Sequence, residues 1–327
     1  MTSRITGTGS CLPAEIITND DLAKVVDTSD EWISTRTGIR SRRIVKGESG
    51  ASMASVAAMR ALENAGVAAE EIELIIVATC TGDLQFPSTA CVVQKEIQAG
   101  QAVAFDLGAA CSGFLFALNT AHAYIQSGVY RKALVIGTEV LSKLVDWTDR
   151  STCVLFGDGA GAAVVEASQE GLQGYVQYSD GAKGEVLSCV SRPVENLIHR
   201  REEETDYRMA ASDYMTMNGQ EVFRFAVKKV PECIHRLLEK TQTGAGEVDW
   251  YILHQANSRI IQSVAKRMGV DEARFPMNMD RYGNTSAASI PILLDEMNRE
   301  GKLIRGQQIV LAGFGAGLTW GAAKLTW

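Results

Sequence analysis

The chain repeats part of its own pattern at a fixed distance of 176 residues. A Leu-Glu pair and the apolar run that follows it, within residues 62–77, return within residues 238–253. Further along, residues 133–137 are matched by residues 309–313 at the same distance. One such match arises easily by chance, whereas two at a single offset indicate duplicated halves. Each half carries the alternating helix-like and strand-like runs that are typical of a βαβ-type module.

The size of the chain fits this duplication. With 327 residues, it is long enough for roughly two domains of about 150 residues each, and we expect halves at 1–171 and 172–327. The composition, 46% hydrophobic and 22% charged, allows a large buried core. No apolar run approaches the length of about 18 residues that a membrane-spanning helix needs, so a membrane location is not expected.

Charge and cysteine content exclude several classes of function. A net charge of -7 disfavours general nucleic-acid binding. Seven cysteines, with no C-x-x-C pair, argue against a disulfide framework and against a zinc site. Residues 1–10 contain one basic residue and no apolar stretch of signal-peptide length, and they read as a first strand. We therefore expect a cytoplasmic protein.

Two glycine-rich runs, 157–161 and 313–317, are expected to form turns before the last strand of each half. Such runs also suggest a dinucleotide site, but that site requires a strand, the glycines and then a helix. Here a strand follows, so nucleotide binding through these loops is disfavoured. Residues 195–215 are polar and charged, and we expect a linker or lid between the halves.

Cys111 stands in the motif Gly-Ala-Ala-Cys-Ser-Gly-Phe, between the short apolar strand 103–105 and an apolar helix expected over 114–125. We expect Gly108 and Gly113 to let the backbone turn sharply and to place the thiol at the helix N-terminus. The helix dipole favours a thiolate there and lowers the pKa from about 8.5 to about 3.5–7.5. This setting favours a nucleophile over a buried core cysteine, and a thiolate exchanges readily with thioesters.

His254 and Asn284 supply the second half of the expected site. His254 ends an apolar strand and, given the duplication, faces the same sheet edge as the Cys111 turn. The other three histidines have no partners at metal-ligand spacing. Asn284 lies between Gly283 and the run Thr-Ser-Ala-Ala-Ser, and from its residues alone a helix N-cap is an equal alternative.

Taken together, these motifs resemble those of the β-ketoacyl-acyl carrier protein synthase III family, within the thiolase-like superfamily. The resemblance covers essentially the whole chain, and further motifs that carry it lie at 30–38, 148–150, 156–161, 217–223 and 318–321. It implies a duplicated five-layer α/β/α/β/α thiolase-like fold. The first half would carry the nucleophile and the second half the His and Asn.

The resemblance also implies a reaction. Cys111 would take an acetyl or short acyl group from coenzyme A. His254 and Asn284 would then hold the thioester carbonyl of malonyl-acyl carrier protein while carbon dioxide leaves, and the enolate would attack the acyl group. Backbone N–H groups of Cys111 and of the loop at Ala316 would hold the oxyanion. No metal, nicotinamide or flavin is implied.

Other positions match binding residues of the family. The adenine and phosphates of coenzyme A would meet Trp32, Arg36 and Arg150, although both arginines also read as surface charges. Phe86 would limit the acyl pocket of the partner across a homodimer interface. The pantetheine tunnel would be lined by Gly219, Phe223 and Asn257. An acidic carrier protein needs a basic docking surface, which would be formed, unless these charges are only a solvated face, by Arg224, Lys228, Gln255, Arg259, Lys266 and Arg267.

Two departures and three alternatives accompany this resemblance. Ala316 stands where many relatives have glycine, and Leu318 replaces an aromatic residue of some relatives, which would widen the primer pocket. One alternative is a related ketosynthase of a polyketide or quinolone pathway, and another is a non-catalytic carrier-protein-binding scaffold. Hydroxymethylglutaryl-type synthases also use a glutamate base, which the segment 79–83 does not obviously supply.

Overall fold

The computed structural model describes residues 1–190 and 214–327. The linker or lid expected over 195–215 lies outside the described residues up to position 213. Among the described residues, no helix is both long enough and apolar enough to cross a membrane.

The first half of the chain builds a five-stranded sheet in the order β1-β7-β6-β4-β5. The central strand pairs are parallel between β4 and β5 and between β4 and β6, whereas β7 runs antiparallel to both β1 and β6. The expected first strand is confirmed. The strands are β1 (Thr2–Cys11), β4 (Leu74–Ala78), β5 (Val103–Leu107), β6 (Lys132–Glu139) and β7 (Gly159–Ser168).

The second half builds a four-stranded sheet in the order β11-β12-β13-β8. Its one parallel pair is β11 with β12, and the other pairs are antiparallel. The expected division after residue 171 falls between β7 and β8, which belong to different sheets. The strands are β8 (Leu172–Ser179), β11 (Trp250–Leu253), β12 (Gln308–Gly315) and β13 (Thr319–Thr326).

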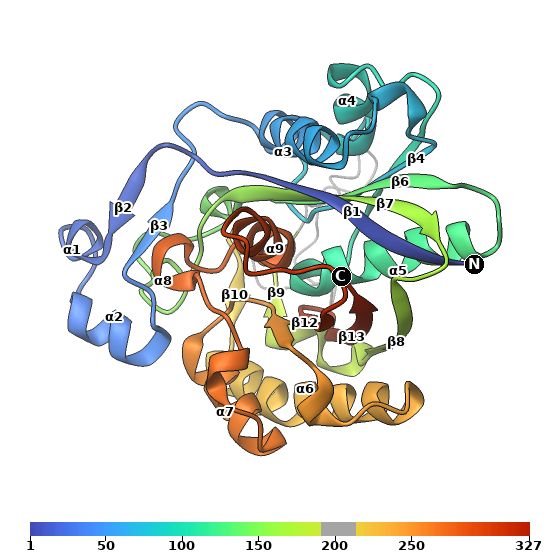
Figure 1. The fold of residues 1–327 in the computed structure, drawn as a ribbon. Helices are drawn as coiled ribbons and strands as arrows, with labels where there is room; N and C mark the ends of the chain where they lie inside the picture. The colour runs from blue at the N-terminus through green and yellow to red at the C-terminus, as the bar shows by residue number, and fades with distance from the viewer. Residues whose placement is uncertain (191–213) are drawn as a thin grey trace.

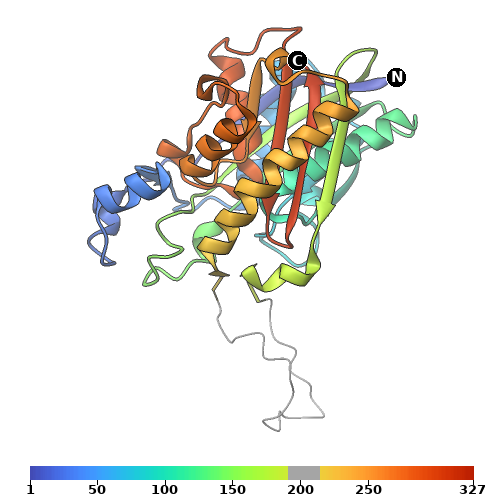
Figure 2. The ribbon, with the colours of Figure 1, turned by 90° about the horizontal axis from the view of Figure 1, so that it is seen from below.

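Helices separate and cover the two sheets, so that five layers result (Figures 1 and 2). The helices α3 and α4 cover the outer face of the first sheet, α5 and α9 lie between the sheets, and α6 with α7 covers the second sheet. The expected five-layer arrangement is confirmed. The helices are α3 (Gly50–Ala65), α4 (Thr89–Glu96), α5 (Gly113–Gln126), α6 (Gly219–Lys240), α7 (Ser258–Met268) and α9 (Ser289–Arg299).

The duplication is visible in the elements themselves. Strand β6 and strand β12 have the same length and lie 176 residues apart, and so do the first residues of α5 and α9. The short helical turns η2 (Ala110–Ser112) and η7 (Ser286–Ala288), which precede these two helices, keep the same spacing. Helix α5 is buried on most of its surface because it packs against both sheets.

A smaller region beside the layers carries one wall of the site. Here α8 packs on β3, α1 packs on α2 and β2, and α2 packs on α7. The elements are β2 (Ile16–Thr18), α1 (Asn19–Leu22), α2 (Asp30–Thr37), β3 (Ser41–Arg43), α8 (Met279–Tyr282), and the short pair β9 (Leu187–Ser188) and β10 (Thr216–Met217).

The glycine-rich runs are not the turns that the sequence predicts. Gly159 and Gly161 lie inside β7, and Gly313 and Gly315 lie inside β12. A Cβ atom on Gly161 would lie 2.7 Å from the backbone nitrogen of Ile292 in α9. These glycines therefore allow helix and strand backbones to approach closely, a need that looks the same in sequence as a need for a turn.

Candidate active site

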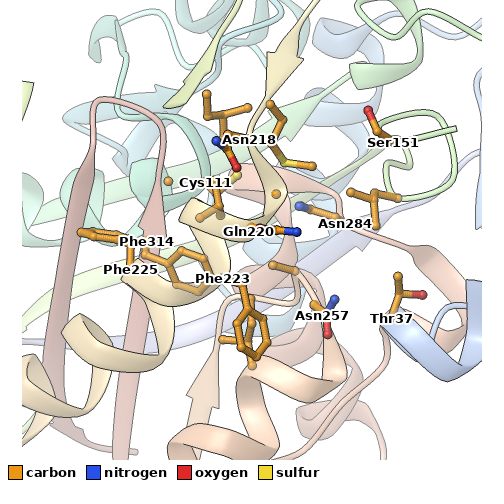
Figure 3. A pocket seen from close by; sticks show the side chains of 18 of the residues that line it. Thr37, Cys111, Ser151, Asn218, Gln220, Phe223, Phe225, Asn257, Asn284 and Phe314 are labelled. Atoms are coloured by element: carbon orange, nitrogen blue, oxygen red, sulfur yellow. The ribbon is translucent and has the colours of Figure 1, made fainter. Parts of the chain in front are cut away.

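Cys111, His254 and Asn284 all line one pocket with a volume of about 1080 Å³. Figure 3 shows Cys111 and Asn284 on the wall of this pocket. Cys111 lies in η2 at the start of α5, His254 follows β11, and Asn284 lies between α8 and η7. Residues from both halves thus meet because the strands and helices that carry them end at a shared edge.

The backbone at the nucleophile turns at Ala110 rather than at a glycine. Ala110 has a φ of 46°, in the left-handed region, whereas Gly108 and Gly113 do not have positive φ. A Cβ atom on Gly113 would lie 3.0 Å from the Cβ of Ala78, and one on Gly315 would lie 2.6 Å from the nitrogen of Cys111. The predicted roles of Gly108 and Gly113 as turn residues are therefore wrong, and close packing explains Gly113.

Burial raises the pKa of the Cys111 thiol to about 12. The Ser286 hydroxyl lowers this pKa and the Glu139 carboxylate raises it, but the loss of water is the largest cause. The predicted low pKa is therefore wrong, because helix-start geometry was considered without desolvation. At neutral pH the sulfur keeps its proton, which has to leave when the sulfur attacks.

His254 is a neutral imidazole that is almost completely buried. Burial lowers its pKa to about 3, and the edge of its ring faces Phe314 at a centroid distance of 5.3 Å. Its Nδ1 lies 2.7 Å from Ser289 Oγ, which also accepts a hydrogen bond from the backbone N–H of Gln255. With that acceptor position taken, the Ser289 hydroxyl is placed to donate to Nδ1, so that Nε2 carries the proton.

The amide of Asn284 is held in one orientation. Its Oδ1 accepts a 2.9 Å hydrogen bond from the backbone N–H of Ser286, which identifies the oxygen and leaves Nδ2 as the donor on the other side. The backbone of Asn284 is tied to Leu155 and Gly157 by hydrogen bonds of 2.8 and 3.0 Å. Both interpretations of the sequence thus have a counterpart, since the oxygen caps the short turn η7 and the residue lines the pocket.

The mouth of the pocket has aromatic and cationic groups. The guanidinium carbon of Arg36 lies 4.6 Å from the ring centroid of Trp32, and that of Arg150 lies 5.0 Å from it. Trp32 and Arg36 line the pocket, while Arg150 stands behind Trp32 and donates to the backbone carbonyl of Asp27. A flat indole flanked by two guanidinium groups suits an aromatic base and phosphates.

The predicted tunnel residues line the middle of the same pocket. Gly219 opens α6 and Phe223 lies one turn further along that helix. Asn257 is the N-cap of α7, and its amide is engaged on both sides: Nδ2 donates to the carbonyl of Arg36 and Oδ1 accepts from the N–H of Arg259. It therefore joins α2 to α7 while lining the wall.

The basic residues divide into two groups. Arg224 and Arg259 line the pocket, and the guanidinium carbon of Arg259 lies 5.8 Å from the ring centroid of Phe223. Lys228, Lys266 and Arg267 are exposed on α6 and α7 but do not line it.

Gln255 requires a correction. It is only 1% exposed, and its amide is engaged in hydrogen bonds to the carbonyl of Leu253 and to the N–H of Asn278. The sequence position next to His254 suggested a surface role, but the strand end turns this side chain inward. Gln255 is therefore not part of a carrier-protein surface.

Two other predicted residues do not line the pocket in this single chain. Ala316 follows Gly315, which does line it, and Ala316 avoids positive φ as its predicted role requires. Phe86 is 86% exposed on the surface.

Sequence reasoning missed three polar residues behind the site, namely Ser286, Ser289 and Glu139. Both serines belong to the motif that contains Asn284, so the motif itself was the available signal. Glu139 ends β6 and is fully buried. A charged residue directly after the apolar run 133–136 was the signal that went unused. Within residues 1–190 and 214–327, no group of three His, Cys, Asp or Glu side chains is arranged to hold a metal ion.

Comparison with known proteins agrees with this geometry. Residues 105–184 match the family model of 3-oxoacyl-[acyl-carrier-protein (ACP)] synthase III, and residues 238–327 match the model of its C terminal. A β-ketoacyl-[acyl-carrier-protein] synthase III of Clostridium acetobutylicum is 49% identical over 324 residues, covering 99% of this chain and 98% of that protein.

Solved structures give the same result. The 3-oxoacyl-[acyl-carrier-protein] synthase III from Aquifex aeolicus VF5 has a TM-score of 0.92 at 46% identity, covering 99% of this chain and 100% of that one. The priming β-ketosynthase from the R1128 polyketide biosynthetic pathway has a TM-score of 0.90 at 36% identity, covering 99% and 96%. The resemblance and the thiolase-like fold expected from the sequence are thereby confirmed. The chain belongs to the β-ketoacyl-[acyl-carrier-protein] synthase III family and is a condensing acyltransferase.

Proposed function

We propose that this enzyme joins an acetyl or short acyl group from coenzyme A to malonyl-acyl carrier protein and so starts fatty acid synthesis. The observation that carries this proposal is the convergence of Cys111, His254 and Asn284 on one pocket. The 49% identical relative is named for the same activity.

In the first step, the sulfur of Cys111 attacks the thioester carbonyl of the acyl-coenzyme A. The bond to the coenzyme A sulfur breaks, and the proton of the Cys111 thiol leaves with the departing thiolate as coenzyme A thiol. Because one thioester replaces another, the step is close to balanced in free energy. Trp32 and Arg36 at the mouth are placed to hold the nucleotide part of coenzyme A.

In the second step, malonyl-carrier protein enters and its thioester oxygen accepts hydrogen bonds from His254 Nε2 and Asn284 Nδ2. The bond to the carboxylate breaks, carbon dioxide leaves, and the electron pair forms an enolate that these donors stabilise. The enolate carbon attacks the acyl carbonyl on Cys111, and the sulfur is expelled. Neutral His254 suits this role because its pKa lies far below physiological pH.

We also propose that the enzyme works as a homodimer in the cytoplasm. An aromatic side chain as exposed as Phe86 is a candidate for burial against a second copy. All seven cysteines are free, which fits a reducing compartment. Arg224 and Arg259 at the pocket mouth offer positive charge to an acidic carrier protein.

The test is condensation itself. Purified enzyme is incubated with malonyl-acyl carrier protein and, one at a time, acetyl, butyryl, isobutyryl and longer acyl-coenzyme A, and the carrier protein is weighed by mass spectrometry. We expect the carrier protein to gain a β-ketoacyl group with the acetyl or short primers. Product from long primers alone would favour the polyketide-type alternative, and no product from any primer would favour the scaffold.

A further inference from the structure

Glu139 is a fully buried carboxyl group that the proposed reaction does not use. It ends β6 and has no exposed surface. Its oxygens accept hydrogen bonds from the hydroxyl of Thr81 at 2.5 Å, the hydroxyl of Ser286 at 3.1 Å and the backbone N–H of Cys80 at 3.2 Å. So many donors around one buried carboxyl group stabilise its charged form.

No cation neutralises Glu139 among the groups that are described around it. The nearby ammonium group of Lys143 donates to the carbonyls of Thr81 and Gly82 and lies 3.9 Å from Asp83, so it serves other partners. The titratable groups that face the carboxyl are the thiols of Cys80 and Cys111, whose pKa values its charge raises. A buried carboxylate without a cation is costly to keep unless its position is useful.

The contact with Ser286 links this carboxyl group to the reacting residues. Ser286 donates its backbone N–H to Asn284 Oδ1 and its hydroxyl to Glu139 Oε1, and the same hydroxyl contacts the sulfur of Cys111. Ser286 has a φ of 49°, in the left-handed region, which is unfavourable for serine. The turn that orients the Asn284 amide is therefore strained, and Glu139 is the acceptor that anchors its side chain.

From this geometry we propose that Glu139 is a positioning residue of the active site. It holds the Ser286 turn, and through it the amide of Asn284 and the sulfur of Cys111. This inference rests on the proposed function, since it assigns Glu139 to the enolate-stabilising half of that reaction. It touches no substrate atom.

The test compares Glu139→Gln, Ser286→Ala and wild type in two assays. In malonyl-carrier protein decarboxylation we expect kcat to fall about tenfold or more in both variants, the loss of roughly one charge-assisted hydrogen bond, with KM unchanged. In the second assay, iodoacetamide alkylation of Cys111 is followed by peptide mass spectrometry at pH 8. Removing the like charge in Glu139→Gln raises the alkylation rate by about three- to tenfold, whereas removing the hydroxyl in Ser286→Ala lowers it.

The opposite signs in the alkylation assay separate positioning from general damage, which would shift both variants in the same direction. Asp158→Asn is the matched control. Asp158 is also fully buried and accepts hydrogen bonds from the hydroxyl of Ser142 and the N–H of Val45, but it is not bonded to Ser286. We expect wild-type rates in both assays for this control.

The proposal is overturned if Ser286→Ala decarboxylates within twofold of wild type, if Asp158→Asn loses as much as Glu139→Gln, or if the two alkylation rates move together. Should Glu139→Gln fail to fold, Ser286→Ala decides alone. Failure of wild type to decarboxylate malonyl-carrier protein would instead refute the proposed function, and the alkylation assay would still be readable.

Discussion

Ser289 Oγ lies 2.7 Å from Nδ1 of His254, on the side of the ring away from the substrate position that we propose. The hydroxyl selects the tautomer in which Nε2 is the donor. Without it, the neutral ring also populates the tautomer with Nε2 unprotonated, which cannot donate to a thioester oxygen.

We therefore expect Ser289→Ala to lower kcat for malonyl decarboxylation by roughly five- to tenfold, which corresponds to about one hydrogen bond. Acyl transfer to Cys111 should change little, because it does not need the His254 donor. Rapid-quench assays of the two half-reactions check this. Equal losses in both half-reactions would mean that Ser289 supports the fold and not the tautomer.

The two half-reactions should also separate the main residues. Cys111→Ala removes the acyl carrier but leaves both donors in place, so we expect acyl transfer to vanish while some decarboxylation remains. His254→Ala removes a donor to the enolate, and its decarboxylation should fall by about 10²–10³-fold. Released carbon dioxide is the measurement. A Cys111→Ala enzyme that is folded but decarboxylates as poorly as His254→Ala would contradict the assignment.

Two buried groups should give opposite pH dependences of stability. Burial lowers the pKa of His254 to about 3, so below its unfolded pKa of about 6.5 the unfolded chain binds more protons and stability falls as the pH falls. Burial raises the pKa of Glu139 to about 7, so between pH of about 4.5 and 7 the folded protein binds more protons and gains stability on acidification.

Urea unfolding of single variants between pH 7 and 4.5 resolves the two effects. Relative to wild type, His254→Gln should gain stability as the pH falls and Glu139→Gln should lose it, each by up to about 1.4 kcal/mol per pH unit. The prediction is wrong if both variants run parallel to wild type across this range.

Gly315 should be required for the nucleophile turn. A Cβ atom there would lie 2.6 Å from the nitrogen of Cys111, so Gly315→Ala has to displace the turn. We expect the rate of acyl transfer to drop at least tenfold and the free energy of unfolding to fall by about 1–3 kcal/mol. Gly108→Ala is the control, because a Cβ atom on Gly108 meets nothing within 4 Å. A Gly315→Ala enzyme with wild-type acyl transfer would refute the close-packing account.

The sequence was sufficient to predict that the three main residues meet. Strand ends of duplicated halves share an edge, and the spacing of 176 residues relates η2 to η7 as it relates β6 to β12. Even the backbone repeats, since Ala110 and Ser286 occupy equivalent positions and both have positive φ. This symmetry explains why a turn from each half lies against the same pocket.

Other properties depend on contacts that no local pattern contains. Whether Gly313 permits a turn or a close approach depends on a distant helix start, and the pKa of Cys111 depends on how completely the chain covers it. Gln255 looked accessible from its polar neighbours, but the direction of its side chain is set by the end of β11. Desolvation and side-chain direction are three-dimensional quantities, and these were the errors.

The most direct test of the account is the acyl-enzyme. Wild-type protein is incubated with radiolabelled acetyl-coenzyme A, without carrier protein, and digested for peptide mass spectrometry. We predict one labelled acetyl group per chain, on the peptide that contains Cys111, and its discharge as product when malonyl-carrier protein is added. A folded enzyme that carries no label on Cys111, or carries it on another cysteine, would contradict the account.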